Sequence, residues 1–354
     1  MKKSVLIFAL IIGLLTSAST AMAQTVNMSR YITLTVTDGA AIKLDFVAAA
    51  TATPVRIVSG SNTQNITVGT GWTGNAYTAD GTTMTVYGDI IGFDCSQNGA
   101  KLTGIDVSNN TQLTELYCSS NRLTTLDVSH NTQLDRIGCR NNRLTTLDVS
   151  HNTQLTYLNC SDNPLGRLDI SKNTQLTELD CSFNKLSSLD VSKNTKLRGL
   201  YCLDNNFTTA ALDDIYCALP DRTGKDNGVI QPVFNSSSSN HATVLATNAA
   251  NATAKNWKVQ YFKDDTDIPA TTGSYVCPTT DIAEASAEQA LTLYPNPVAD
   301  VLYLSATART VRVYNIYGIE VAHATDTDRV EVSHLPAGVY TVNADSMVAK
   351  MVKR

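Results

Sequence analysis

The chain has 354 residues, of which 27 are Lys or Arg and 32 are Asp or Glu, so its formal net charge at neutral pH is −5. This length is typical of about two domains, and the scatter of the basic residues along the sequence argues against nucleic acid as a partner. The eight cysteines make the cellular compartment the first question.

The first residues have the pattern of a signal peptide. Two lysines precede an apolar run over residues 5–15, and small residues follow it up to Ala23. This order predicts a signal peptide over residues 1–23 with cleavage before Gln24, whereas the alternative is a buried N-terminal helix. The apolar run is too short to span a bilayer and no later stretch approaches the length needed. We therefore expect a mature protein without a transmembrane segment.

Residues 24–94 are expected to form a small β-rich region. Within residues 31–46, apolar and polar residues alternate on both sides of Asp38-Gly39, which predicts a β-hairpin. Residues 84–98 then lead into a different, repeating pattern. Because a repeat array needs an end piece that keeps its core from water, we interpret residues 24–94 as an N-terminal cap.

A 21-residue repeat occupies the middle of the chain, residues 95–206. Five units without a gap cover residues 102–206 and share the pattern L-x-x-L-x-C-x-x-N-x-L, in which Ile137 replaces the second leucine of the second unit and Phe207 the last leucine of the fifth. A disulfide framework has no reason to be periodic, whereas a structural repeat does. We therefore assign the repeating cysteines to the repeat itself. They are Cys95, Cys118, Cys139, Cys160, Cys181 and Cys202.

Each repeat predicts one short strand. Leu116 and Cys118 alternate with polar residues, so both are expected to point inward. Coils stacked about 4.8 Å apart would bury these side chains in a continuous core, where a free cysteine behaves as a small hydrophobe. We interpret the cysteines as a ladder of buried, reduced thiols. Two columns of asparagine, represented by Asn110 and Asn121, are expected to hydrogen-bond backbone groups at the turns.

The units, beginning with LTGIDVSNNTQLTELYCSSNR, resemble leucine-rich repeats in which cysteine stands where leucine is usual. The 21-residue length, the cysteine and the phrase L-D-V-S-x-N-T look most like the internalin J-like subgroup of bacterial surface proteins. That resemblance implies a β-rich solenoid whose concave sheet binds a protein or glycan on host cells or neighbouring bacteria, in adhesion or biofilm formation.

Residues 207–277 follow the repeats with a mixed pattern. The first stretch places apolar residues on one helical face and ends at Pro220, and the segments GVIQPVF and WKVQYF read as strands around a further helical stretch. We interpret this region as an α/β C-terminal cap and the polar residues 278–290 as a linker. The pairing of Cys217 and Cys277 stays open.

Two groups of side chains could bind metal ions. Asp264, Asp265 and Asp267 lack the glycine and the distal glutamate of a calcium loop, so we favour a solvated acidic turn. His130 and His151 lie on neighbouring repeats, but the equivalent positions hold Asn and Lys, which favours an exposed, freely varying site. We expect no metal and no cofactor.

The last segment, residues 291–354, has a pattern of its own. Alternating runs separated by glycines predict a small antiparallel β-sandwich. The ordered phrases Y-P-N-P, Y-N-x-x-G and L-P-A-G-V-Y resemble the type A C-terminal sorting domain of type IX secretion. This resemblance implies export by the type IX machinery of a Gram-negative bacterium, to a secreted or outer-surface location. The residues that carry it are Tyr294, Pro295, Asn296, Pro297, Gly318, Gly338 and Tyr340.

No catalytic constellation emerges. The five histidines are scattered, no nucleophile-elbow or zinc-protease motif occurs, and the glycine-rich phrase VGTGWTG (68–74) lacks the strand–helix context of a phosphate loop. We therefore do not expect an enzyme. The alternatives are an activity within residues 207–277 and a solenoid with a purely structural role in a surface layer.

The outward positions of the repeat strands vary while the inward ones do not, which is typical of a binding surface. We expect Tyr117, Tyr157 and Tyr201 to share one outward position on the first, third and fifth repeats. The predicted partner-binding residues are Glu115, Tyr117, Arg136, Arg140, Tyr157, Asn159, Glu178, Asp180 and Tyr201.

Overall fold

The computed structural model describes residues 25–278, 291–315, 319–345 and 347–354. Its contacts divide the chain into one unit that ends at Cys277 and a second that starts at Pro278. The predicted signal peptide, Gly318 and most of the predicted linker lie outside the described residues. In the described ranges, no helix is long and apolar enough to cross a membrane.

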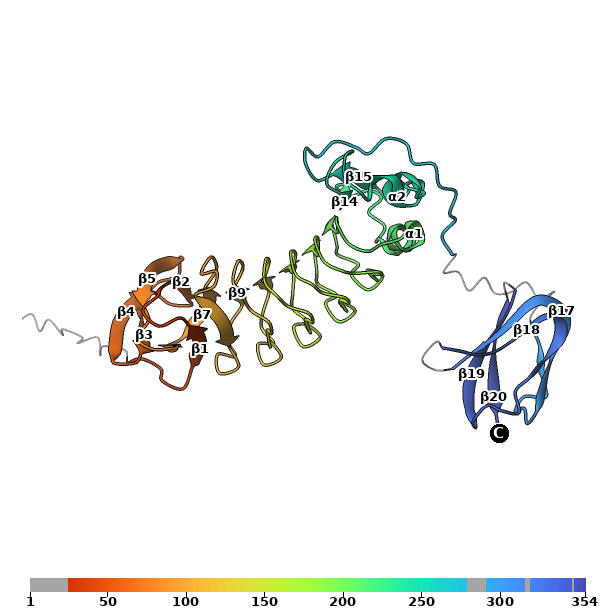
Figure 1. Ribbon diagram of the computed structural model, residues 1–354, viewed down its shortest axis with the longest axis horizontal. Helices are drawn as coiled ribbons and strands as arrows, with labels where there is room; N and C mark the ends of the chain where they lie inside the picture. Colours follow the sequence, from red (N-terminus) through yellow and green to blue (C-terminus); the bar gives the residue numbers. More distant parts are fainter. Residues whose placement is uncertain (1–24, 279–290, 316–318, 346) are drawn as a thin grey trace, which may run out of the picture. The chain divides into compact units, whose positions relative to one another are not determined.

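The first unit begins with two β-sheets that share one core (Figure 1). One sheet is antiparallel with the strand order β4-β3-β6-β1-β8, and the other contains β5, β2 and β7 and continues into the repeats. The strands are β1 (Tyr31–Val36), β2 (Ala41–Ala48), β3 (Thr53–Ser59), β4 (Asn62–Val68), β5 (Thr73–Thr78), β6 (Thr83–Tyr87), β7 (Ile90–Asp94) and β8 (Leu102–Asp106).

The predicted hairpin of residues 31–46 is wrong, because β1 and β2 belong to different sheets. β1 pairs with β6 and β8, whereas β2 pairs with β5 and β7. Each strand has one fully buried face, represented by Ile32 and Phe46, and both faces belong to the same core. Two such strands cover each other's apolar face best in opposite layers. The turn at Gly39 (φ 69°) therefore connects the sheets.

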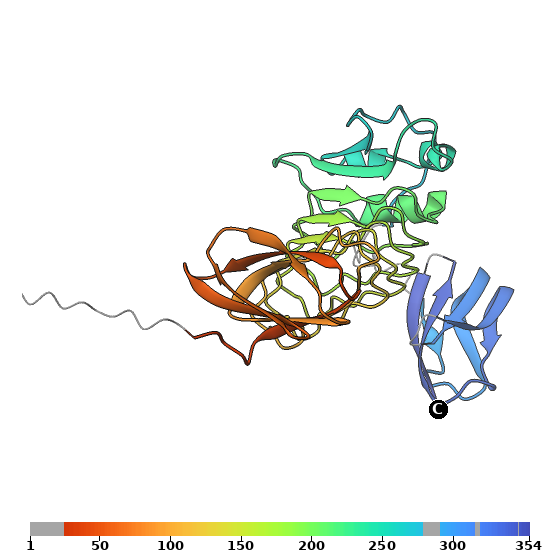
Figure 2. The ribbon, with the colours of Figure 1, turned by 60° about the vertical axis from the view of Figure 1, so that its left-hand side comes forward.

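Five three-residue parallel strands, one per repeat, form the middle of the first unit. Neighbouring strands pair in register, so the coils lie side by side (Figures 1 and 2). The resulting ten-stranded sheet has the order β15-β14-β13-β12-β11-β10-β9-β7-β2-β5. The strands of the repeats are β9 (Glu115–Tyr117), β10 (Arg136–Gly138), β11 (Tyr157–Asn159), β12 (Glu178–Asp180) and β13 (Gly199–Tyr201).

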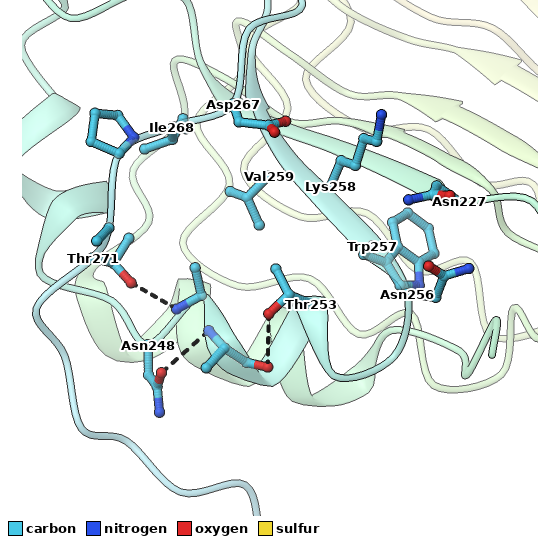
Figure 3. Close-up of a pocket in the computed structure, with 14 residues that line it drawn as sticks. Asn227, Asn248, Thr253, Asn256, Trp257, Lys258, Val259, Asp267, Ile268 and Thr271 are labelled. Atoms are coloured by element: carbon cyan, nitrogen blue, oxygen red, sulfur yellow. Dashed lines mark hydrogen bonds between the residues drawn. The ribbon is translucent and has the colours of Figure 1, made fainter.

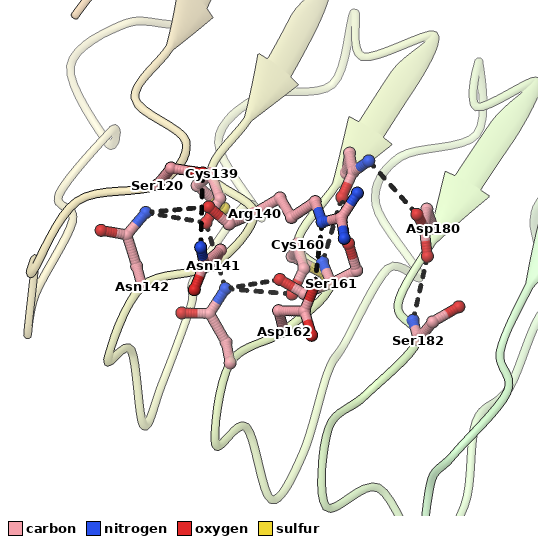
Figure 4. A network of polar contacts seen from close by, with 12 residues as sticks. Ser120, Cys139, Arg140, Asn141, Asn142, Cys160, Ser161, Asp162, Asp180 and Ser182 are labelled. Atoms are coloured by element: carbon pink, nitrogen blue, oxygen red, sulfur yellow. Dashed lines mark hydrogen bonds and ion pairs between the residues drawn. The ribbon is translucent and has the colours of Figure 1, made fainter. Parts of the chain in front are cut away.

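The core of the repeats is built from the middle residue of each strand and the cysteine two positions later. Leu116 and Cys118 are fully buried, and so are their counterparts in the other repeats. All six repeating cysteines are free thiols. Asn121 then ties adjacent coils together, because its Nδ2 donates to the carbonyls of Cys95 and Cys118 at 2.9 Å each. The equivalent asparagines of later repeats do the same (Figure 4).

A backbone turn with positive φ follows each of these cysteines by two residues. The backbone N–H of such a residue joins the next coil, as where Asn141 donates to the Ser161 carbonyl at 2.9 Å. Asn and Asp tolerate this left-handed conformation better than a bulky side chain does. The residues are Gln97, Ser120, Asn141, Asp162, Phe183 and Asp204.

Beyond the repeats, the sheet gains two parallel strands that pack against short helices. The hydroxyl of Thr208 accepts a hydrogen bond from the Ala211 N–H and caps the first helix. A disulfide between Cys217 and Cys277 ties the end of the unit to that helix. The elements are α1 (Thr209–Ala218), β14 (Gly228–Val233), α2 (His241–Leu245), α3 (Ala250–Thr253) and β15 (Trp257–Tyr261).

The second unit is one antiparallel sheet that curls until it is nearly closed, instead of the two-sheet sandwich that we expect. The long strand β17 pairs with β16, β18 and β19, and β19 pairs with β20. A bridge between Val298 and Lys353 brings the two ends of the sheet together, around a separate apolar core. The strands are β16 (Leu293–Tyr294), β17 (Val301–Tyr314), β18 (Glu320–Glu331), β19 (Gly338–Ala344) and β20 (Met347–Lys353).

Candidate binding surface

The outward side chains of β9–β13 form a continuous surface, which we call the sheet face. In β11, for example, Leu158 is fully buried while Tyr157 and Asn159 on either side of it are partly exposed. The structure brings the predicted partner-binding residues together here, since eight of the nine lie in these five strands and Arg140 follows β10 by two positions.

The tyrosines of the sheet face lie in two columns, so the expectation of a single column is wrong. Tyr117 is opposite Gly138 and occupies the third position of its strand, as Tyr201 does. Tyr157 is opposite Arg136 and occupies the first position. Positions one and three of a strand share a face because side chains alternate with a period of two. The rings therefore form a zigzag instead of a line.

Charged neighbours orient the tyrosines. The guanidinium carbon of Arg136 lies 5.7 Å from the centre of the Tyr157 ring, which is a cation–π contact. The Tyr117 hydroxyl donates to the Glu115 carboxylate at 2.9 Å. Burial, followed by this hydrogen bond, raises the pKa of Tyr117, so the phenol stays protonated at neutral pH. Both rings are thus held in place before any partner arrives.

Polar residues beside these rings pair with one another across the coils (Figure 4). Arg140 Nε lies 2.8 Å from an oxygen of Asp162, and the Asn159 amide donates to Asp180 at 3.2 Å. The other oxygen of Asp180 accepts the Ser182 N–H. Exposed pairs of this kind contribute little to stability. They can therefore exchange partners with a bound molecule at small cost.

Exposed aromatic rings lie at both ends of the sheet face. The Trp72 ring centre is 5.8 Å from that of Tyr117. At the other end, the Phe262 ring is 6.2 Å from Tyr201 and 6.1 Å from Phe234. Trp72, Phe234 and Phe262 are at least 37% exposed. None of the three is among the predicted partner-binding residues, because all of them lie outside the repeats, and Trp72 stands out in the sequence merely by its place in a glycine-rich phrase.

A cavity of about 530 Å³ lies between α3, β15 and the segment 267–271 (Figure 3). Its polar groups already serve the fold, since Thr271 accepts the Ala249 N–H and Asn248 accepts the Ala250 N–H. The titratable side chains among its lining residues are Lys258 and Asp267. As far as the structure describes this cavity, it brings no nucleophile and base together.

The repeating cysteines have the properties of packing residues. Burial raises the pKa of every one of these thiols, to about 12 for Cys139 and Cys202. A thiol of this kind is protonated at neutral pH and is a poor nucleophile or metal ligand.

The three carboxylates after β15 accept hydrogen bonds from three different residues of the protein. Asp264 accepts the Thr266 N–H, Asp265 accepts from Gln231, and Asp267 accepts from Gln260. On the repeats, His130 and His151 are exposed. Within the described residues, no group of three or more His, Cys, Asp or Glu side chains is placed to hold a metal ion.

The Y-P-N-P phrase of the second unit contacts the last strand. Asn296 donates from Nδ2 to the Lys350 carbonyl and accepts the Val352 N–H, both at 2.8 Å. Its neighbours Pro295 and Pro297 are exposed.

Two tyrosines complete the described part of this motif. Tyr294 stacks on Tyr303 with ring centres 5.8 Å apart. Tyr340, two residues after Gly338 at the start of β19, donates to the Pro336 carbonyl at 2.8 Å. Asn296 therefore joins the start of this unit to its last strand, and Tyr340 orders the turn before β19.

Comparison with known proteins finds matches to parts of this chain. Residues 292–354 match the family described as the secretion system C-terminal sorting domain. The functional domain of InlJ from Listeria monocytogenes, which includes a cysteine ladder, is similar at 23% identity and a TM-score of 0.36, over 75% of this chain and 67% of that one. An internalin, InlF, from the same organism is 22% identical with a TM-score of 0.31, over 32% of this chain and 35% of that one.

A leucine-rich-repeat protein from Leptospira interrogans is also similar, at 22% identity and a TM-score of 0.31, over 36% of this chain and 33% of that one. This chain thus spans about a third of the length of the InlF and Leptospira structures. No curated protein matches the sequence. The stacked repeats of the first unit have a leucine-rich-repeat architecture, and the matched C-terminal segment is a type IX sorting domain, by which the protein is secreted or held at the outer cell surface.

Proposed function

We propose that the sheet face binds a macromolecular partner, a protein or a glycan, in adhesion or biofilm formation at the cell surface. The observation that carries this proposal is the difference between the inward and outward positions of each strand. The two inward positions hold leucine or isoleucine, followed by cysteine, in every repeat, whereas the outward positions differ from repeat to repeat. A solvated face without a partner would not need the tyrosine and arginine residues that are favoured anchors of interfaces.

The zigzag of rings supports the same proposal. Tyr157 lies near the middle of the sheet face beside Arg136, and Tyr117 and Tyr201 lie in strands nearer its two ends. Aromatic rings next to charges of both signs suit a partner with polar edges better than a small apolar ligand. We further infer that the chain is not an enzyme, because its free thiols are buried and its cavity pairs no nucleophile with a base among the described residues.

The test is a matched pair of substitutions in β11. The mature protein is first screened against host matrix proteins and bacterial surface glycans, and affinities are then measured for each partner found. Tyr157→Ala should weaken binding by about 1 kcal/mol or more and leave the melting temperature almost unchanged, because this ring supports little of the core. Leu158→Ala is the control, since loss of this fully buried side chain should destabilise the unit by about 2–5 kcal/mol.

If Tyr157→Ala binds every partner as tightly as the wild type, the sheet face is not the binding site. If the screen finds no partner at all, a purely structural role in a surface layer takes precedence.

A further inference from the structure

An acidic and aromatic depression lies where the sheet face meets the N-terminal strands; we call it the Trp72 pocket. Three of its residues stand directly opposite one another on adjacent strands, because Asp45 in β2 pairs with Asp94 in β7 and Asp94 pairs with Tyr117 in β9. Trp72, from the segment before β5, completes the lining. The pocket thus continues the sheet face beyond the repeats.

Glycines make room for this arrangement. A Cβ atom at Gly92 would lie 3.1 Å from the Trp72 ring, so the indole rests on bare backbone. A Cβ atom at Gly74 would lie 1.6 Å from an Asp45 carboxylate oxygen, so that carboxylate occupies the space of a missing side chain. The indole nevertheless stays 45% exposed. The indole is therefore held in position by the backbone beneath it, while a large part of its surface is open to a partner.

Among the described residues, neither carboxylate of the pocket forms an ion pair with the protein. Within the described residues, Asp45 has no hydrogen-bond or ion-pair partner, and one oxygen of Asp94 accepts only the Ser96 N–H. Burial, and then the charge of Asp94, raise the pKa of Asp45, which Lys43 partly offsets. Two facing carboxylates cost free energy in the unbound protein, and a cation between them would relieve that cost.

We propose that the Trp72 pocket binds a basic side chain, the ammonium of a lysine or the guanidinium of an arginine, presented by a protein partner. The two aspartates supply the opposite charge, and the exposed indole offers a cation–π surface. A neutral sugar would stack on the indole as well but would gain little from two ionised carboxylates. This inference rests on the proposed binding role of the sheet face and specifies the chemistry at one end of it.

The protein carries its own reporter for this site. The chain has two tryptophans, and Trp257 is only 1% exposed, in contrast to Trp72. A capped tetra-arginine peptide, titrated into the full mature protein at low salt, should change the tryptophan fluorescence, whereas capped tetra-glutamine and a neutral glucose tetrasaccharide should not. Trp72→Leu should abolish the change.

The decisive variant is Asp45→Asn, which removes the charge without removing a hydrogen bond or an ion pair seen among the described residues. It should weaken tetra-arginine binding by about fivefold, while its melting temperature stays the same or rises. Asp226→Asn, an equal change of charge at an exposed residue after the repeats, should bind as the wild type does. Unchanged affinity of Asp45→Asn, or a fluorescence response to the tetrasaccharide but not to the peptide, would overturn the proposal.

The outcome is separable from that of the proposed function. A partner whose binding is weakened by Tyr157→Ala but not by Asp45→Asn would leave the sheet face as the binding surface and remove only the basic-side-chain inference. If Asp45→Asn weakens peptide binding but Tyr157→Ala affects no partner, the basic-side-chain site stands and the sheet face is removed as the binding surface.

Discussion

Replacing Cys160 tests whether the ladder positions are dry. The residue is fully buried, and its neighbours on the adjacent coils, Cys139 and Cys181, are fully buried too. Cys160→Ala removes the sulfur and its contacts, and Cys160→Ser removes the same contacts but adds a hydroxyl. The nearby Cys160 carbonyl already accepts from Asn163 at 3.2 Å and Asn184 at 3.1 Å. A new hydroxyl therefore has to compete for an acceptor or stay unpaired.

An unpaired buried hydroxyl costs about 1–3 kcal/mol. We accordingly expect Cys160→Ser to be less stable than Cys160→Ala by about that amount. Chemical denaturation of the purified mature protein gives both free energies of unfolding, and equal slopes of the two transitions would show that the comparison is sound. Equal free energies, or a more stable serine variant, would mean that the column holds water or free acceptors and that the packing interpretation fails.

Five further predictions concern the cysteines, one turn, the pH dependence and the sorting domain. Thiol counting in denaturant without reductant should find six free thiols, and reduction of Cys217–Cys277, which closes a 60-residue separation, should cost roughly 4 kcal/mol. Phe183 has φ 53° and is exposed, so Phe183→Asn should stabilise the unit by about 0.5–1 kcal/mol, measured by denaturation; no gain would mean that its ring packs usefully. The free energy of unfolding should fall as the pH rises from 9.0 to about 12, because the thiols of the unfolded chain ionise near pH 9.0 whereas those of Cys139 and Cys202 in the folded protein have a pKa of about 12. A Cys139→Ala/Cys202→Ala variant should show a shallower fall. Deletion of residues 291–354 should leave the first unit folded but retained in the cell, as fractionation and circular dichroism can show; surface display of the truncated protein would refute the sorting role.

The repeat architecture could be predicted because its signal is redundant. Five successive units have nearly the same leucines, cysteine and asparagines, so each unit is expected to form the same strand and the same turn. The type IX sorting domain could be predicted for the same reason, since several short phrases occur in a fixed order. The match of residues 292–354 to the sorting-domain family confirms it.

Pairing across long sequence distances could not be read in this way. The alternation in β1 and β2 shows that each strand buries one face, but it does not say whether their partners lie beside or opposite them. One partner of β1 is β8, far along the chain, and Thr35 of β1 lies opposite Gly104 of β8. Trp72 gave no periodic signal at all, because its position on the sheet face depends on the pairing of β2 with β5 and β7.

The repeats separate the residues that stabilise the protein from those that could recognise a partner. The buried hydrogen bonds between coils run through asparagines and the backbone, as Asn142 shows by donating to the carbonyls of Cys118 and Cys139 at 3.0 Å each. None of these bonds involves an outward side chain. A change at Tyr157 therefore leaves the hydrogen bonds between coils intact, whereas a change at Leu158, one residue along, opens the core. Because the core and the buried hydrogen bonds use other residues, the outward residues of one repeat can change without altering the packing of the next. This independence is what allows a repetitive scaffold to present a non-repetitive surface.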